Sequence, residues 1–88
     1  MYKLNAKPEM NIIGGRIREA RKAAHLKQRE LSIQLELKGI YICHGSISRL
    51  EHGARCITDY EIKAIAEILA VSPNDLFGWN TPTHQGEE

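Results

Sequence analysis

Cysteine is scarce in this chain of 88 residues, and long apolar runs are absent. Two cysteines are too few for a disulfide framework and fit a reducing compartment. No apolar run approaches the roughly 20 residues of a membrane span, and no signal peptide is visible at the start. We therefore expect one cytoplasmic domain that does not enter a membrane, with room for one core but little surplus stability.

The sequence also lacks the marks of an enzyme or a metal protein. It shows no clustered carboxylates and no glycine-rich phosphate loop. Sulfur and imidazole are suitable zinc ligands, but the paired spacing of a zinc site is missing from the residues available: Cys43, His44, His52 and Cys56. A Cys43–His44 nucleophile pair is disfavoured because neighbours in sequence rarely face one another. We expect no catalysis, no metal and no cofactor.

Charge is distributed unevenly, although the net charge is only +1. Residues 1–29 carry eight Lys or Arg against two Glu, whereas residues 30–57 carry three of each sign. Residues 58–88 carry one Lys against six acids. A basic front and an acidic back suit a domain that turns one face towards phosphate. Taken alone, the same charges would also fit an ordinary mixed surface.

The first helix is predicted after a short irregular segment. Residues 1–10 show no apolar period and are expected to form a flexible arm. From Asn11, a plausible cap, the pattern becomes helical and runs to about Ala24. The apolar residues that line one face of this helix are Ile13, Ile17, Ala20 and Ala24.

The second helix is predicted over residues 27–38, where Leu31 and Leu35 lie four positions apart on one face. Residues 39–45 follow as an extended linker. Its two isoleucines, Ile40 and Ile42, alternate with polar positions and should tuck under the core.

Residues 46–53 predict a short third helix that ends at a glycine, the usual left-handed stop. At 100° per residue, Ile47 and Leu50 share the buried side. The opposite side carries Gly45, Ser48, Arg49 and His52. A short polar face with one bidentate donor fits a major groove and can read base edges there.

Two further helices complete the domain. Thr58 and Glu61 have capping-box spacing and should open a fourth helix. Its apolar face follows i, i+3, i+4 and i+7 through Ile62, Ile65, Ala66 and Leu69. Ser72, as a cap, and Pro73 start a last short helix. Residues 80–88 are expected to be a disordered tail. The prediction is an all-α domain of five helices over residues 11–79.

The order of these motifs resembles the phage repressor/Cro-type helix-turn-helix family. The pieces lie between Ile12 and Gly78 and read Arg-Ile-Arg-x-x-Arg, Gln-x-x-Leu, Ile-Ser-x-Leu-Glu-x-Gly, Thr-Asp-Tyr-Glu and Leu-Ala-Val-Ser-Pro-x-x-Leu-Phe. The resemblance implies a compact lambda-repressor-like fold and a repressor-like transcriptional regulator that binds double-stranded DNA sequence-specifically. Its third helix, about residues 45–52, would lie in the major groove.

The resemblance also implies which residues meet the DNA. The glutamine that matches Gln28 opens the second helix and touches the DNA backbone or a base. Together with the reading surface and neighbouring cations, the candidate DNA contacts are Lys27, Gln28, His44, Gly45, Ser46, Ser48, Arg49, His52 and Arg55. In this family the last helix often carries a dimer contact, here Leu76, Phe77 and Trp79, which implies a homodimer on a palindromic operator.

Three features depart from the family's pattern. The linker between the second and third helices is longer than the tight turn of the compact phage members, as in longer-turn relatives. Lys27 stands where a serine or threonine cap is usual, and Cys43 stands where the third helix is usually capped. Because a lost cap costs about 1 kcal/mol, both helix starts are expected to fray slightly. We expect Lys27 to contact a phosphate instead.

One buried ion pair is predicted. Glu51 lies at 40° on the third helix, beside buried Ile47 and Leu50, so its carboxylate needs a partner. Arg21 borders the apolar face of the first helix and matches the family arginine that pairs with this glutamate. The sequence therefore predicts an Arg21–Glu51 salt bridge between the first helix and the third.

Plainer explanations exist for several of these residues. Arg49 would be an ordinary surface arginine if it paired with a carboxylate. Leu76, Phe77 and Trp79 could simply cap the core, and for Leu76 this role is favoured over a dimer contact. The rival function is a protein-interaction module, such as an antitoxin or adaptor with the same fold. The basic front argues against this rival, whereas the aromatic C-terminal end permits it.

Overall fold

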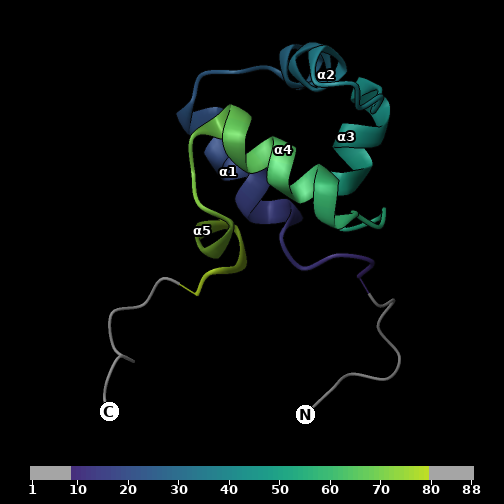
Figure 1. The fold of residues 1–88 in the computed structure, drawn as a ribbon. Coiled ribbons are helices and arrows are strands. Elements are labelled where there is room, and N and C mark those ends of the chain that lie inside the picture. Colours follow the sequence, from purple (N-terminus) through teal and green to yellow (C-terminus); the bar gives the residue numbers. More distant parts are fainter. Residues whose placement is uncertain (1–8, 80–88) are drawn as a thin grey trace, which may run out of the picture.

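The computed structural model describes residues 9–79, and this part of the chain is all-helical, as predicted. The predicted tail and most of the predicted arm, residues 80–88 and 1–8, lie outside the described residues. The helices are α1 (Gly14–Ala23), α2 (Gln28–Leu37), α3 (His44–Glu51), α4 (Asp59–Leu69) and α5 (Pro73–Phe77) (Figure 1).

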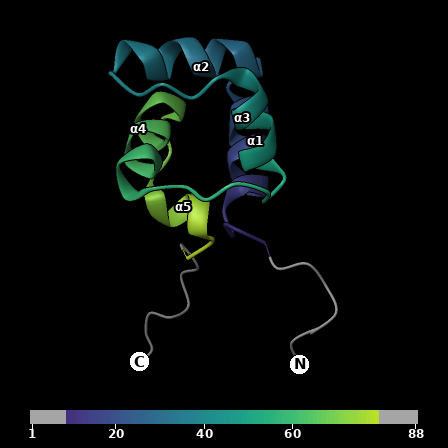
Figure 2. The same cartoon turned by 90° about the vertical axis from the view of Figure 1, so that its right-hand side faces the viewer.

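The helices surround one core. Figure 2 shows α2 lying across one end of the molecule, with α1 and α3 on one side and α4 on the other. Helix α3 packs against α1 and α2, whereas α5 packs against α1 and α4 at the end away from α2. This arrangement leaves α3 on one flank of the domain with an outer face free of other helices.

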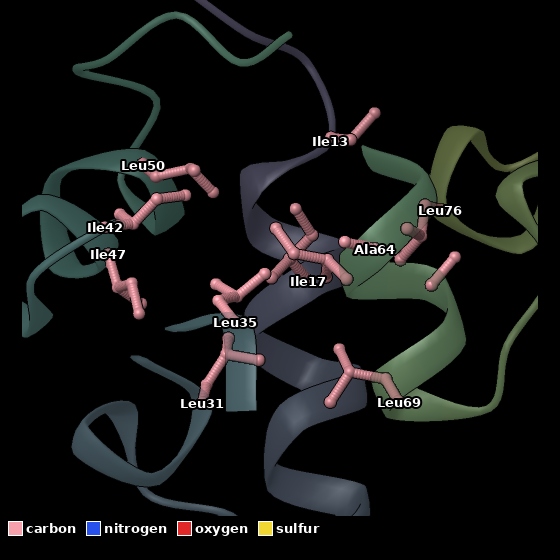
Figure 3. Packing of buried hydrophobic residues seen from close by; sticks show 12 residues of the cluster. Ile13, Ile17, Leu31, Leu35, Ile42, Ile47, Leu50, Ala64, Leu69 and Leu76 are labelled. Atoms are coloured by element: carbon pink, nitrogen blue, oxygen red, sulfur yellow. The ribbon is translucent and has the colours of Figure 1, made fainter. Parts of the chain in front are cut away.

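Apolar residues from all five helices meet in this core (Figure 3). Ile17, Leu31 and Leu35 have no exposed surface and form its centre. The predicted apolar faces are confirmed, except that Ala24 is exposed and follows the end of α1. Burial of such side chains stabilises each by about 1.5–3 kcal/mol, which is the main force that holds the helices together.

The linker between α2 and α3 is extended and contains no strand, as predicted. Ile42 is buried in the core, and Ile40 packs partly against it. Ser32 fixes the same segment, because its hydroxyl donates a hydrogen bond to the Ile42 carbonyl at 2.6 Å. This hydrogen bond ties the end of the linker to the middle of α2 and so restricts where α3 can begin.

Helix starts agree with the sequence in two places and differ in two. Thr58 and Ser72 accept hydrogen bonds from backbone N–H groups of α4 and α5, as their capping spacing predicts. The third helix begins at His44, two residues earlier than expected. The first begins at Gly14, and the Asn11 side-chain oxygen accepts hydrogen bonds from the N–H groups of Ile13 and Gly14.

Met10 precedes the predicted start of the domain at residue 11 and already contacts it. Met10 donates its backbone N–H to the carbonyl of Gly53 at 2.8 Å. The ordered domain therefore includes at least Met10, which the sequence pattern had placed in the arm. A backbone hydrogen bond of this kind leaves no periodic signal in the side chains.

No helix within residues 9–79 has the length and apolar character needed to cross a membrane.

Two helices end in a left-handed residue that is not glycine: His25 follows α1, and Ala70 follows α4 with φ of 58°. A left-handed residue with a Cβ atom costs about 1–2 kcal/mol, and glycine avoids that cost. Glycine also increases the conformational entropy of the unfolded chain, and this reduces the stabilisation of the folded state by about 0.4–1 kcal/mol.

We predict that Ala70→Gly stabilises the domain by up to about 1 kcal/mol. The matched control is Ala20→Gly, a half-buried position inside α1, which should destabilise by at least about 1 kcal/mol. Urea denaturation followed by circular dichroism measures both. Equal destabilisation by the two substitutions would show that the left-handed turn at Ala70 is not strained.

Candidate nucleic-acid interface

Helix α3 has one buried side and one exposed side. Ile47, Leu50 and Glu51 are buried. The predicted reading residues lie on the other side, where His44, Gly45, Arg49 and His52 are exposed and Ser46 and Ser48 are half-buried. The amphipathic pattern predicted for this helix is therefore confirmed, and six of the nine candidate DNA contacts share its outer face.

Arg49 is the strongest hydrogen-bond donor on this face. One guanidinium nitrogen, Nη2, donates to the Ser46 hydroxyl at 3.1 Å. No carboxylate within residues 9–79 forms a salt bridge with Arg49, so the alternative of an ordinary surface ion pair is not what the structure shows. The rest of the guanidinium fork remains available to a ligand outside the domain.

His52 lies at the C-terminal end of α3, and Cys43 lies at its N-terminal end. The His52 Nδ1 lies 2.7 Å from the Ser48 carbonyl and must donate to it, so a neutral ring presents Nε2 as an acceptor. Cys43 precedes α3 and is exposed. Hydrogen bonds from the side chain and backbone of Ser46 lower the pKa of the Cys43 thiol.

Among residues 9–79, no cluster of His, Cys, Asp and Glu could hold a metal ion.

The start of α2 lies against the end of α3. Gln28 is half-buried, and its side-chain nitrogen donates to Glu51 Oε1 at 3.1 Å. Lys27 cannot cap α2, because an ammonium group has no acceptor. The Glu30 carboxylate compensates in part, since it accepts the backbone N–H of Lys27 at 2.7 Å. Lys27 itself is exposed and forms no salt bridge with the described residues.

The predicted Arg21–Glu51 salt bridge is confirmed. Arg21 Nε donates to Glu51 Oε2 at 2.7 Å, and Nη2 donates to Oε1 at 3.0 Å. The two side chains are only 9% and 0% exposed. The remaining terminal nitrogen of Arg21 donates to the Leu26 carbonyl at 2.8 Å. Glu51 therefore accepts three hydrogen bonds, and α3 is tied to α1 and to the start of α2 through one carboxylate.

Arg55, one of the predicted DNA contacts, is engaged within the domain, and its contact with DNA stays a prediction. Its two terminal nitrogens lie 3.2 and 3.3 Å from the oxygens of Glu61, and one of them also donates to the Cys56 carbonyl. Burial alone would raise the pKa of Glu61, but the hydrogen bonds from Arg55 and Thr58 together hold it below its usual value. Arg55 thus fastens the loop after α3 to the start of α4.

The expected dimer contact also changes. Leu76 is buried in the core of the single chain, so it cannot meet a second copy. Phe77 and Trp79 have stacked rings with centroids 5.8 Å apart, and Trp79 is 74% exposed. Of the three predicted dimer residues, Phe77 and Trp79 therefore remain available to a partner.

Sequence reasoning gave Asn11 only the role of a helix cap. The structure shows that its side-chain nitrogen also donates to the carbonyls of Leu50 and Arg55, at 2.9 and 2.8 Å. These partners are 39 and 44 residues away along the chain. The only sequence signal was a buried-looking asparagine at a helix start, which does not identify partners so distant.

We predict that Arg21→Ala lowers the free energy of unfolding by about 3–5 kcal/mol, because it leaves the buried Glu51 carboxylate without its main partner. The matched control is Lys63→Ala, which removes an exposed ion pair with Glu67 and should cost far less, because solvent screens that pair. Urea denaturation at neutral pH compares the two. Losses of similar size would show that the buried pair contributes no more than a surface pair.

Taken together, the outer face of α3 offers one unpaired guanidinium, two histidines and two hydroxyl groups on a helix held from behind by a buried salt bridge. Such a face can donate and accept hydrogen bonds but has no nucleophile–base pair and no phosphate loop. No protein-family model, no curated protein and no solved structure matches this chain.

Proposed function

We propose that this protein is a repressor-like transcriptional regulator that binds double-stranded DNA sequence-specifically, with α3 in the major groove. The observation that carries the proposal is the outer face of α3, where Arg49 is exposed and free of any carboxylate partner among the described residues. A planar guanidinium fork matches guanine O6 and N7 together, which is the commonest specific contact in the major groove. The proposal places the protein in the cytoplasm, with no catalysis and no cofactor.

The residues around Arg49 fit secondary roles in such a complex. The hydroxyl groups of Ser46 and Ser48 can each donate or accept a hydrogen bond. His44 lies at the helix start, where it can reach a base or a phosphate. Lys27 and Gln28 stand at the start of α2, where the N-terminal end of a helix favours a phosphate. Gln28 would then join the DNA backbone to Glu51, because one of its N–H groups already binds that carboxylate.

Charge on α1 supports the same orientation. Arg18 and Lys22 are exposed and, like Lys27, form no salt bridge with the described residues. By contrast, the lysines Lys38 and Lys63 both pair with Glu67. Cations without a carboxylate partner are thus present on α1 and at the start of α2 as well as at Arg49, and phosphate contacts from them would fix the register of the complex.

A homodimer fits this function. One small module buries only about 600–1,000 Å² of protein surface on DNA, so two copies on a palindromic site would share the work of recognition. The stacked Phe77 and Trp79 give an exposed aromatic surface for a two-fold contact. In that arrangement the two reading helices would lie roughly 34 Å apart, in successive major grooves.

A second candidate function is a protein-interaction module, such as an antitoxin or adaptor. The observation in its favour is on α2, where Ile33 and Leu37 lie four positions apart and are 50% and 75% exposed. Exposed apolar side chains in one row can mark a protein contact. Their row is short, however, and two side chains give little area compared with a stable interface of about 800 Å² per partner.

We predict that Arg49→Ala weakens binding to a specific duplex by about 1–3 kcal/mol and to scrambled DNA by much less. Arg49→Lys should lose nearly as much specificity, because lysine lacks the bidentate fork. The specific duplex is one enriched from a random library by the wild-type protein, or the DNA upstream of its own gene. Fluorescence anisotropy in moderate salt measures both affinities.

Lys27→Ala is the matched comparison, since Lys27 should meet a phosphate. It should weaken both duplexes similarly and reduce the slope of log K against log salt by about one. Equal losses on both duplexes for Arg49→Ala would make Arg49 a phosphate contact and pass base reading to His44, Ser46 and Ser48. Failure of the wild-type protein to enrich any duplex would favour the protein-interaction alternative.

We predict that Trp79→Ala shifts the complex from two protein chains per palindromic duplex to one, because the truncation removes most of the exposed aromatic surface. Analytical ultracentrifugation with and without the duplex measures the stoichiometry. Ile33→Ala is the control, because it removes an exposed apolar side chain from α2 and should leave two chains bound. Wild-type protein that binds a palindrome strictly as one chain would contradict the dimer.

A further inference from the structure

The segment before α1 contacts the C-terminal end of α3 through a set of buried polar groups. Met10 donates its N–H to the Gly53 carbonyl at 2.8 Å. Asn11 donates to the Leu50 carbonyl at 2.9 Å and to the Arg55 carbonyl at 2.8 Å. These carbonyls belong to the last turn of α3 and to the loop that follows it. The segment before α1 is therefore hydrogen-bonded to both.

The orientation of the Asn11 amide is fixed by its partners. Its nitrogen faces two carbonyl oxygens, and its oxygen faces the N–H groups of Ile13 and Gly14 at 3.1 and 2.7 Å. Only an amide can donate two hydrogen bonds and accept two in this way. Asn11 is also buried, so water does not substitute easily for any of the four partners.

Gly14 brings the backbones of α1 and α3 together. A Cβ atom at this position would overlap the Leu50 carbonyl oxygen and would meet the Glu51 backbone carbon at 3.1 Å. The α1–α3 separation therefore depends on glycine here, because the obstacle is backbone and cannot rotate away. Glycine serves as the point of closest approach, and Asn11 supplies the hydrogen bonds across it.

The end of α3 that is held in this way carries the proposed reading group. Arg49 immediately precedes Leu50, whose carbonyl accepts the Asn11 hydrogen bond. The end of α3 is also closed internally, since Gly53 and Ala54 donate to the carbonyls of Leu50 and Arg49. A shift of Leu50 relative to α1 would therefore move the backbone from which Arg49 extends.

We propose that Asn11 and Gly14 are positioning residues for DNA reading: by fixing the last turn of α3 against α1, they set the place of Arg49 relative to the bases. This inference rests on the proposed function. Bidentate hydrogen bonds to a base need both donors in line at about 3 Å, whereas phosphate contacts tolerate larger displacements. Loss of the contact between α1 and α3 should therefore reduce the affinity for the specific duplex more than the affinity for DNA of any sequence.

Asn11→Asp tests this proposal. Aspartate keeps an oxygen for the Ile13 and Gly14 N–H groups, so α1 remains capped. It places a second oxygen against the Leu50 and Arg55 carbonyls, where a donor is required. The added negative charge weakens binding to every duplex, so the readout is the ratio of affinities for the enriched duplex and a scrambled one. We expect this ratio to fall by about tenfold, within the range set by one bidentate base contact.

Gly14→Ala is the second variant, and it alters no charge and removes no hydrogen-bonding group. Its Cβ atom must push the Leu50 carbonyl away, so the same ratio should fall. The control is Leu69→Ala, which opens a cavity in α4, a helix that packs against α1, α2 and α5. It should lower the melting temperature at least as much as the other two changes but leave the affinity ratio unchanged.

The outcomes separate the two proposals. If the wild-type protein discriminates between the duplexes and both Asn11→Asp and Gly14→Ala keep the wild-type ratio, the positioning role is wrong and the proposed function stands. A ratio that falls equally in Leu69→Ala would also overturn the positioning role, because general destabilisation would explain it. Wild-type protein that binds no duplex would overturn the proposed function and this inference together. The positioning role is supported if the affinity ratio falls in Asn11→Asp or Gly14→Ala while the variant stays folded by circular dichroism and Leu69→Ala keeps the wild-type ratio.

Discussion

The buried pair of Arg21 and Glu51 is the interaction on which the placement of α3 depends. A helix of eight residues is too short to persist by its own hydrogen bonds, so its position must come from packing. Ile47 and Leu50 supply apolar burial, but two aliphatic side chains leave the rotation of the helix weakly specified. The carboxylate of Glu51 restricts that rotation, because two bonds from Arg21 and one from Gln28 must be satisfied together in a site closed to water.

The two ends of α3 are fixed by different means. At the C-terminal end the carbonyls of Arg49 and Leu50 accept hydrogen bonds from Ala54 and Gly53, and Asn11 adds a bond from another part of the chain. At the N-terminal end stands Cys43, a poor cap in comparison with serine or aspartate, and the position is set mainly by burial of Ile42. The better-fixed end carries Arg49, the group with the strictest geometric demand, whereas the exposed His44 lies at the other end.

The sequence predicted the five helices and most of the core because each leaves a local pattern, and it predicted the Arg21–Glu51 pair from the need of Glu51 for a cation together with the family resemblance. Periodicity marks an apolar face, capping spacing marks a helix start, and a carboxylate beside buried leucine demands a cation. What it missed depends on distant backbone: Met10 binds Gly53, and Asn11 binds Leu50 and Arg55, through carbonyls that every residue possesses. The partner of Arg55 was missed for a related reason, and the burial of Leu76 decides between two roles that the sequence left open. Charge and hydrophobicity indicate what a side chain can do, but only the folded chain shows that Glu61 neutralises the first and that the core encloses the second.

The distribution of ion pairs is the strongest argument between the two candidate functions. Within residues 9–79, Arg21, Lys38, Arg55 and Lys63 all pair with carboxylates, and each of these pairs joins two parts of the fold or lies along α4. The cations that form no such pair are Arg16, Arg18, Lys22, Lys27, Arg29 and Arg49, and they belong to α1, the start of α2 and the outer face of α3. Cations left without carboxylates repel one another and reduce stability slightly, a cost that a phosphate ligand would remove. The apolar pair on α2 has a simpler explanation, because single exposed leucine and isoleucine side chains are common on stable monomers. The charged groups therefore favour a polyanion over a protein as the ligand of this domain.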